Sequence, residues 1–535
     1  MQILQRAWQR AAISATALCL CASSSFVSAT YPPWAHADLV QTTEQQPQQP
    51  PQQQQQRLII TPEAYNSLLR SQAIPPSPSL DQFPPLSSLT LPKQQRFTLQ
   101  NGLRVILIED TEAPLVRGNL LMKGGTRASP PDKIGLASIA AAVQRAGGSH
   151  THPNGQLDDA LEALAAAIEG NAGSDAVSFG FECLAEGEDV STVMKLFAEV
   201  ITDPEVPESK VELYKRQALN SIAHRNDNAG GIPVREAAKL IYGLDSPYAA
   251  EPTVETVSSI SSDDVVSWLK TWERPDRAVL GIVGPFRSND IKKVIEQTLG
   301  EWEIGSRDTN IVIPTPEVAG RAPQDVRGKV YFINRPGLSQ ASVAMADVGI
   351  QMMDEDEEAL DVLGGILNSF GGRLFDDIRS RSGLAYSVSG GWATVPLDHR
   401  GLFIATAETA QPEQLIKALK QAFVQTVTTA PTEEEVANAK EQSSNSFVFS
   451  FQSNVSQLRR AVAFELLGIP QDYPFLYMKK LSSVTAGDVW SAAKRHVRPD
   501  DLVTVVIGDA TKIDTRKLVV GGGDGGTVTE SLKLQ

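Results

Sequence analysis

The chain has 535 residues, of which 41% are hydrophobic, and its formal net charge at pH 7 is -15. This length is enough for about two to four domains with large apolar cores. The acidic balance argues against nucleic acid and against an anionic membrane surface as partners.

Residues 1–37 are predicted to be a signal peptide that directs export. Arg6 and Arg10 precede an apolar stretch of small residues over 11–27, which is short for a spanning helix of about 20 strongly apolar residues. Cleavage signals of the small-x-small type follow at 27–29 and 35–37, and we favour cleavage after Ala37. An uncleaved anchor is the alternative. After cleavage no transmembrane segment is expected, and a periplasm is favoured over a lumen-type compartment.

Residues 38–92 are predicted to be a disordered spacer, because Gln and Pro dominate 41–56 and such a composition buries too little apolar surface. Apolar alternation on both sides of Asn101-Gly102 then predicts a β-hairpin over 96–107. A further strand is expected over 115–123.

Helices follow these strands. Apolar periodicity predicts one helix over 135–145, another over 157–168 and a third over 190–201. Between the last two, Cys183 ends an alternating apolar pattern that begins at Val177. Its thiol is therefore expected to be buried and inert.

An internal repeat organises the rest of the chain. Residues 258–284 and 482–508 align without a gap at an offset of 224. Both segments contain a helix start, an Arg-Pro-Asp turn and an apolar strand. The repeat predicts two α+β domains, each a mostly antiparallel sheet packed with helices. We place them at 93–300 and 329–515, with a linker near 301–328 and a flexible tail over 516–535.

The order of motifs resembles the pitrilysin/insulinase-type metallopeptidases, in their short-chain, processing-peptidase-like branch. In the first half, the hairpin is followed by Gly124-Gly125-Thr126 and by Gly135-Leu136-Ala137 at a helix start. In the second half, the resemblance rests on the segments 371–375 and 383–388. It covers residues 93–515 and implies two-domain subunits that pair to enclose a chamber.

Active members of that family carry His-x-x-Glu-His on the first helix, where two His one turn apart bind zinc and the Glu activates water. Here Ser138 stands at the first His, Ala141 at the Glu and Ala142 at the second His. The third ligand, a Glu on a later helix, is matched by Ser221, give or take one residue. These side chains cannot hold zinc, so no metal is predicted for this chain.

The histidines offer no replacement for this site. His-x-x-x-His occurs nowhere in the sequence. His150 and His152 form the one close pair outside the predicted signal peptide, and they have no evident third ligand.

The family's second-domain motif is retained, and it includes Arg379 and Tyr386. The resemblance implies that these two side chains reach toward a zinc site and hold the substrate and the oxyanion formed during hydrolysis. A purely structural alternative makes Arg379 a cation at a helix C-terminus and Tyr386 an aromatic residue of a strand.

These features predict a non-catalytic subunit of a heterodimer. Its zinc-bearing family homologue would hydrolyse extended peptides, with Arg379 and Tyr386 supplied in trans. The alternative is a non-enzymatic peptide-binding or scaffold protein of the same fold. A third possibility is an independent peptidase with an unrecognised site.

Overall fold

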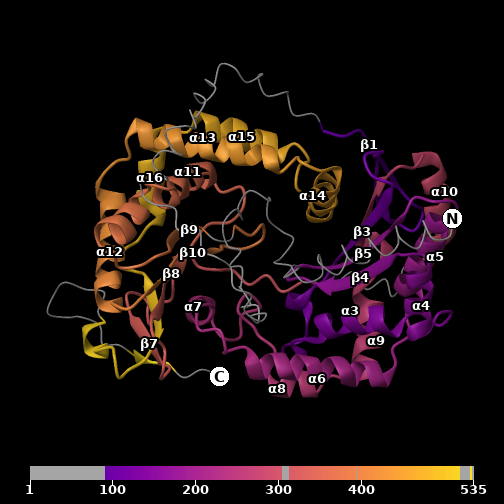
Figure 1. The fold of residues 1–535 in the computed structure, drawn as a ribbon, viewed down its shortest axis with the longest axis horizontal. Helices are drawn as coiled ribbons and strands as arrows, with labels where there is room; N and C mark the ends of the chain where they lie inside the picture. The colour runs from indigo at the N-terminus through magenta and orange to yellow at the C-terminus, as the bar shows by residue number, and fades with distance from the viewer. Residues whose placement is uncertain (1–90, 304–312, 393–394, 519–529, 533–535) are drawn as a thin grey trace, which may run out of the picture. The chain divides into compact units, whose positions relative to one another are not determined.

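The structure is a computed structural model that describes residues 91–303, 313–392, 395–518 and 530–532. The predicted signal peptide, the predicted spacer as far as residue 90, and most of the predicted tail lie outside these ranges, as do residues 304–312 of the linker. Two six-stranded sheets with accompanying helices succeed one another along the chain (Figure 1), which confirms the predicted α+β duplication.

The first sheet has the order β1-β2-β6-β3-β5-β4, and all its pairings are antiparallel except β2 with β6. The predicted hairpin is confirmed, with Phe97 opposite Val105 and with Gly102 at a φ of 89° in the turn. The strands are β1 (Gln94–Thr98), β2 (Arg104–Glu109), β3 (Leu115–Lys123), β4 (Ala167–Ala172), β5 (Ala176–Leu184) and β6 (Ala278–Gly284).

The second sheet has the order β12-β7-β11-β8-β10-β9, in which β7 pairs in parallel with β11 as β2 does with β6. The edge strand β12 differs from its counterpart β1, since it pairs in parallel with β7. The strands are β7 (Val330–Asn334), β8 (Ala341–Val348), β9 (Val388–Trp392), β10 (Leu402–Thr409), β11 (Val503–Gly508) and β12 (Glu530–Ser531).

Helices flank both sheets. Those of the first half are α3 (Leu136–Gly147), α4 (Gly155–Ala163), α5 (Asp189–Thr202), α6 (Glu208–His224), α7 (Ile232–Tyr242), α8 (Val254–Ser258), α9 (Ser262–Trp272) and α10 (Ser288–Leu299). Those of the second half are α11 (Glu357–Asn368), the π-helical η6 (Phe375–Arg381), α12 (Pro412–Thr428), α13 (Glu433–Phe449), α14 (Asn454–Leu467), α15 (Tyr473–Ser483) and α16 (Ala486–His496). Short 3-10 turns are η3 (Thr126–Ala128), η4 (Pro131–Lys133), η5 (Pro275–Arg277) and η7 (Thr515–Lys517).

One predicted helix is too long. The helix expected over 157–168 ends at Ala163, and Ile168 lies in β4 instead. Ala165 has a φ of 47°, a left-handed conformation that ends the helix and turns the chain into the strand. The prediction for Cys183 is confirmed, because its side chain is buried in β5 and this burial raises the pKa of the thiol to about 12. Within the described ranges, no helix combines the length and the apolar character needed to cross a membrane.

The sequence repeat is visible in matching helix starts. In α9, Ser261 and Asp264 form a capping box, and in α16, Thr485 and Asp488 form the same one at the offset of 224. Such a box satisfies N–H groups that the first turn of a helix leaves without partners.

Each half also covers the sheet of the other half. Helix α7 packs on β8 and β11 of the second sheet, whereas α14 packs on β6, β3 and β2 of the first (Figure 1). The contact on the first sheet is apolar, because Leu458, Val462 and Leu466 join one buried cluster with Ile106 and Val283. The two halves accordingly fall within one compact unit.

An ion pair between the buried Arg127 and the solvent-exposed Asp398 links the halves as well. The Arg127 guanidinium contacts Asp175 of its own half, and it lies 2.7 Å from a carboxylate oxygen of Asp398 in the second half. Burial opposes ionisation of Asp398, but hydrogen bonds from His399 and Arg127 outweigh it and lower the pKa of Asp398 to about 2. The pair therefore stays ionised across the whole neutral range.

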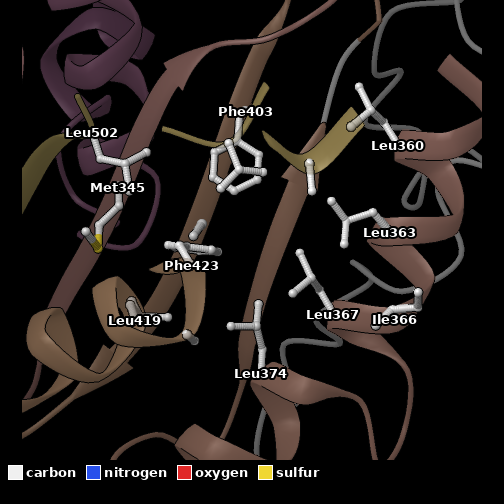
Figure 2. Packing of buried hydrophobic residues seen from close by; sticks show 14 of the residues in the cluster. Met345, Leu360, Leu363, Ile366, Leu367, Leu374, Phe403, Leu419, Phe423 and Leu502 are labelled. Carbon is white, nitrogen blue, oxygen red and sulfur yellow. The ribbon is translucent and has the colours of Figure 1, made fainter. Parts of the chain in front are cut away.

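The core of the second half supports the segment that follows α11. Figure 2 shows Leu363 and Leu367 of α11 and Phe403 of β10 among the buried residues of this core. Leu374, two residues after Gly371-Gly372, is fully buried in the same cluster. Its burial fixes one end of η6.

The packing of α14 on the first sheet can be tested at Gly281. A Cβ atom at this position of β6 would lie 2.5 Å from Val462 Cγ2 of α14, whereas a Cβ at Gly180 of β5 meets nothing nearer than 3.4 Å. We expect Gly281→Ala to lower the free energy of unfolding by about 1–3 kcal/mol through overpacking. Gly180→Ala is the matched control. Equal unfolding curves for the two variants in urea would contradict this packing.

Candidate functional site

The first group of candidate residues lies on α3. The helix starts after Gly135, whose φ of 109° lies in the left-handed region, and it buries Leu136, Ile139 and Val143 against its neighbours. Ser138 and Ala142 are one turn apart on the more open side of the helix, with Ser138 exposed and Ala142 half-buried. Ala141 is buried in the cluster beneath the first sheet.

The later helix, α6, packs against α3. Its contribution to the shared cluster is uncharged and comes from Val211, Tyr214, Ala218, Leu219 and Ile222. Ser221 is exposed, and its hydroxyl donates a hydrogen bond of 3.1 Å to the Gln217 carbonyl within the helix. The four motif positions thus offer two hydroxyl groups and two methyl groups. This chemistry does not fit Zn²⁺, which takes thiolate, imidazole or carboxylate ligands.

The two close histidines do not converge on a common point. His150 Nδ1 lies 2.9 Å from Asp203, whereas His152 Nδ1 lies 2.6 Å from Glu199. Each imidazole therefore has its own carboxylate partner.

In the described part of the chain, one group of three possible metal ligands lies close together. It consists of Asp354, Asp356 and His496. However, Arg495 contacts both carboxylate oxygens of Asp356, and His496 Nε2 lies 2.8 Å from one of them. Burial opposes ionisation of Asp356, but these two partners outweigh it and lower its pKa. The group is therefore an ion-pair network in which the Arg495 guanidinium supplies the positive charge beside Asp356.

The second group of candidates is centred on η6. The Arg379 guanidinium carbon lies 4.5 Å from the centroid of the Tyr386 ring and 4.8 Å from that of Phe375. The Phe375 ring in turn lies 4.8 Å from Phe370. We call Phe370, Phe375, Arg379 and Tyr386 the aromatic row.

The aromatic row stands in solvent although it consists largely of apolar rings. Tyr386 is 81% exposed and Phe370 is 91% exposed. Tyr386 lies in the loop before β9 and not in a strand, so the structural alternative for it does not apply. The row brings Arg379 and Tyr386 into contact. Arg379 also lies in the last turn of η6, as the structural alternative for it expects.

Two glycines and one asparagine position the backbone segments that carry the aromatic row. Gly371 has a φ of 81°, and a Cβ at Gly372 would lie 2.8 Å from the carbonyl oxygens of Ile366 and Ser369. The Asn368 side chain, at the end of α11, accepts a hydrogen bond from Gly390 N at 2.8 Å and donates to Gly390 O at 2.9 Å. These bonds tie β9, which follows the loop of Tyr386, to α11.

Sequence reasoning identified Arg379 and Tyr386 but missed Phe370 and Phe375. A signal for Phe370 was present, since a phenylalanine directly before Gly371-Gly372 lies in a turn that cannot bury it. Phe375 carries no such signal, because an aromatic residue at the start of a helical segment more often packs in a core.

Comparisons with known proteins match both halves of the chain to one peptidase family. Residues 104–237 match the family model described as insulinase (peptidase family M16), and residues 259–443 match the one described as peptidase M16 inactive domain. A protein of Bacillus subtilis, named an uncharacterized zinc protease YmxG, is 23% identical over 70% of this chain and 88% of its own length. A Helicobacter pylori protein, named non-peptidase homolog YmxG, is 22% identical over 77% of this chain and 93% of its own.

A solved structure gives the same result at the level of the fold. A crystal structure of a peptidase M16 inactive domain from Pseudomonas fluorescens superposes with a TM-score of 0.67 at 23% identity and covers 78% of this chain and 98% of its own. The two family models and this superposition extend over both halves of the duplication. The chain belongs to the insulinase family of peptidases, peptidase family M16.

Proposed function

We propose that this chain is the non-catalytic subunit of an exported, heterodimeric zinc metallopeptidase. One combined observation carries the proposal: Ser138, Ala141 and Ala142 occupy the zinc-motif positions, while Arg379 and Tyr386 stand exposed and in contact. Under this proposal a zinc-bearing family member binds the metal and activates water. Its partner, this chain, contributes walls of the chamber and the two side chains in trans.

The chemistry of the pair suits this role. Phe375 and Tyr386 both lie against the Arg379 guanidinium, so its N–H groups are presented at the edge of the stack. The guanidinium of Arg379 and the hydroxyl of Tyr386 are thus two hydrogen-bond donors at fixed positions. We propose that they bind the oxygen of the scissile carbonyl, where negative charge develops as water attacks.

The fold supports an extended substrate. β9 is an edge strand of the second sheet and begins two residues after Tyr386. An edge strand presents backbone groups to which a peptide can add as a further strand. In β9 such pairing would use the strand on either side of Gly390, whose own N–H and C=O are bound by Asn368. A peptide bound there would pass close to Tyr386.

The competing proposal is a binding or scaffold protein without a role in proteolysis. The relative named a non-peptidase homolog supports it. The two proposals differ in what the aromatic row does, because only the first requires Arg379 and Tyr386 to affect turnover.

The double variant Arg379→Ala/Tyr386→Phe tests the proposal in the complex with the zinc-bearing subunit. Loss of one oxyanion donor costs about 10²–10³ in rate, so we expect kcat to fall at least about 100-fold. Assembly and zinc content of the complex should not change. Arg381→Ala, at an exposed neighbouring position of η6, is the matched control. Normal peptide turnover by the double variant would reject the trans-acting role.

The donors need a rigid support, and Arg373 provides part of it. Its Nε and Nη2 donate to the two oxygens of Glu435 at 2.7 and 2.8 Å. Glu435 also completes the capping box of α13 with Thr432. The hydrogen bond from Arg373 is the main reason why the pKa of Glu435 lies below its usual value of 4.5. This clamp joins the turn at Gly371-Gly372, which we call the glycine turn, to α13.

The lowered pKa makes the clamp sensitive to acid. A carboxyl whose pKa is lower in the folded state contributes stability above the unfolded pKa of 4.5, and the contribution disappears as the pH falls through the folded value. At pH 7 we expect Glu435→Gln to be less stable than the wild type by about 1 kcal/mol, a modest value because the carboxyl is partly exposed to solvent. The difference in unfolding free energy should shrink below pH 4. A difference that stays constant from pH 7 to pH 3 would argue against the clamp.

A further inference from the structure

A cavity of about 300 Å³ lies beside the aromatic row. It is bounded by the end of α11, the glycine turn and α13. Residues of all three segments line it, among them Ile366, Phe370, Gly372, Glu435, Asn438 and Gln442. The same contacts that support the row therefore also shape this cavity.

The walls expose more polar than apolar surface, and the apolar part comes from Ile366 and Phe370. Ile366 is a buried residue of the core, and Phe370 exposes 91% of its surface. Asn438 and Gln442, both exposed on α13, contribute carboxamides. The one carboxylate of the lining, Glu435, has both oxygens bound by Arg373. The cavity thus carries no uncompensated charge, and it favours an uncharged side chain over a charged one.

A chain of ring and cation contacts leads from the cavity to the proposed donors. Phe370, at its wall, is separated from Tyr386 by three ring and cation contacts, each shorter than 5 Å. An extended peptide rises about 3.3 Å per residue and covers this path in at most about four residues. One bound peptide can therefore occupy the cavity and reach Tyr386.

We propose that the cavity is a subsite for an uncharged aromatic side chain of an extended peptide, within four residues of the bond that faces Arg379 and Tyr386. The exposed ring of Phe370 offers a stacking partner, and the carboxamides of Asn438 and Gln442 offer hydrogen bonds at the rim. The relation to the cleaved bond rests on the proposed function. Binding of the aromatic side chain does not.

The test measures peptide binding to the full chain without any partner. The probes are four fluorescently labelled nonapeptides of Gly, Ser and Ala that differ only in the central residue, which is Phe, Leu, Lys or Asp. By fluorescence anisotropy we expect the Phe peptide to bind at least tenfold more tightly than the Lys and Asp peptides, and more tightly than the Leu peptide; equal binding of the Phe and Leu peptides would overturn the aromatic preference. Phe370→Ala should reduce this preference, and Phe370→Tyr should retain it.

A matched pair on α13 tests the location. Asn438→Trp fills the cavity and should weaken binding of the Phe peptide at least tenfold. Ala437→Trp adds the same ring at the neighbouring exposed position outside the lining and should change the affinity less than twofold. Equal effects of the two substitutions, equal binding of the four peptides, or no binding of any of them would overturn the subsite.

The subsite and the proposed function can fail separately. If Arg379→Ala/Tyr386→Phe leaves turnover unchanged but Asn438→Trp still weakens binding, the trans-acting role is wrong and the subsite stands. If the double variant abolishes turnover but Asn438→Trp binds the Phe peptide normally, only the subsite is wrong.

Discussion

Two apolar contacts hold the two halves together. One lies between α14 and the first sheet, and the other lies between α7 and the second sheet. In each case a helix from one half buries a sheet of the other half. Complete burial of a side chain such as Leu458 or Val462 contributes roughly 1.5–3 kcal/mol. Separation of the halves would expose both sheets, so neither half is expected to keep its structure alone. The ion pair of Arg127 with Asp398 adds a directional link to this apolar one.

This construction explains how the zinc motif can be lost while the fold persists. The face of α3 that meets α6 belongs to an apolar cluster of the first half, and Ala141 packs beneath the first sheet. Serine and alanine at the motif positions leave no buried charge without a partner. The aromatic row rests on a different cluster, that of the second half, through Leu374 and Ile378. One site could therefore change without disturbing the other.

Much of the fold could be predicted because its signals are local. The Asn101-Gly102 hairpin, the strand over 115–123 and the repeat at an offset of 224 all follow from patterns within short windows. The packing of α7 and α14 on the sheet of the other half could not be predicted. An apolar stripe indicates that one face of a helix is buried, but not which sheet buries it. The same limit applies to the site. The family resemblance pointed to Arg379 and Tyr386, whereas the stack with Phe370 and Phe375 depends on the path of the glycine turn.

The central claim is that this chain works beside a subunit that holds the metal. Isolation of a tagged form from its own cells, with identification and stoichiometry of the associated chains and measurement of zinc, tests it most directly. The account predicts an equimolar partner that bears His-x-x-Glu-His, together with one zinc ion per heterodimer. Recovery of this chain alone or only as a self-dimer, or zinc bound to the purified chain itself, would contradict the account.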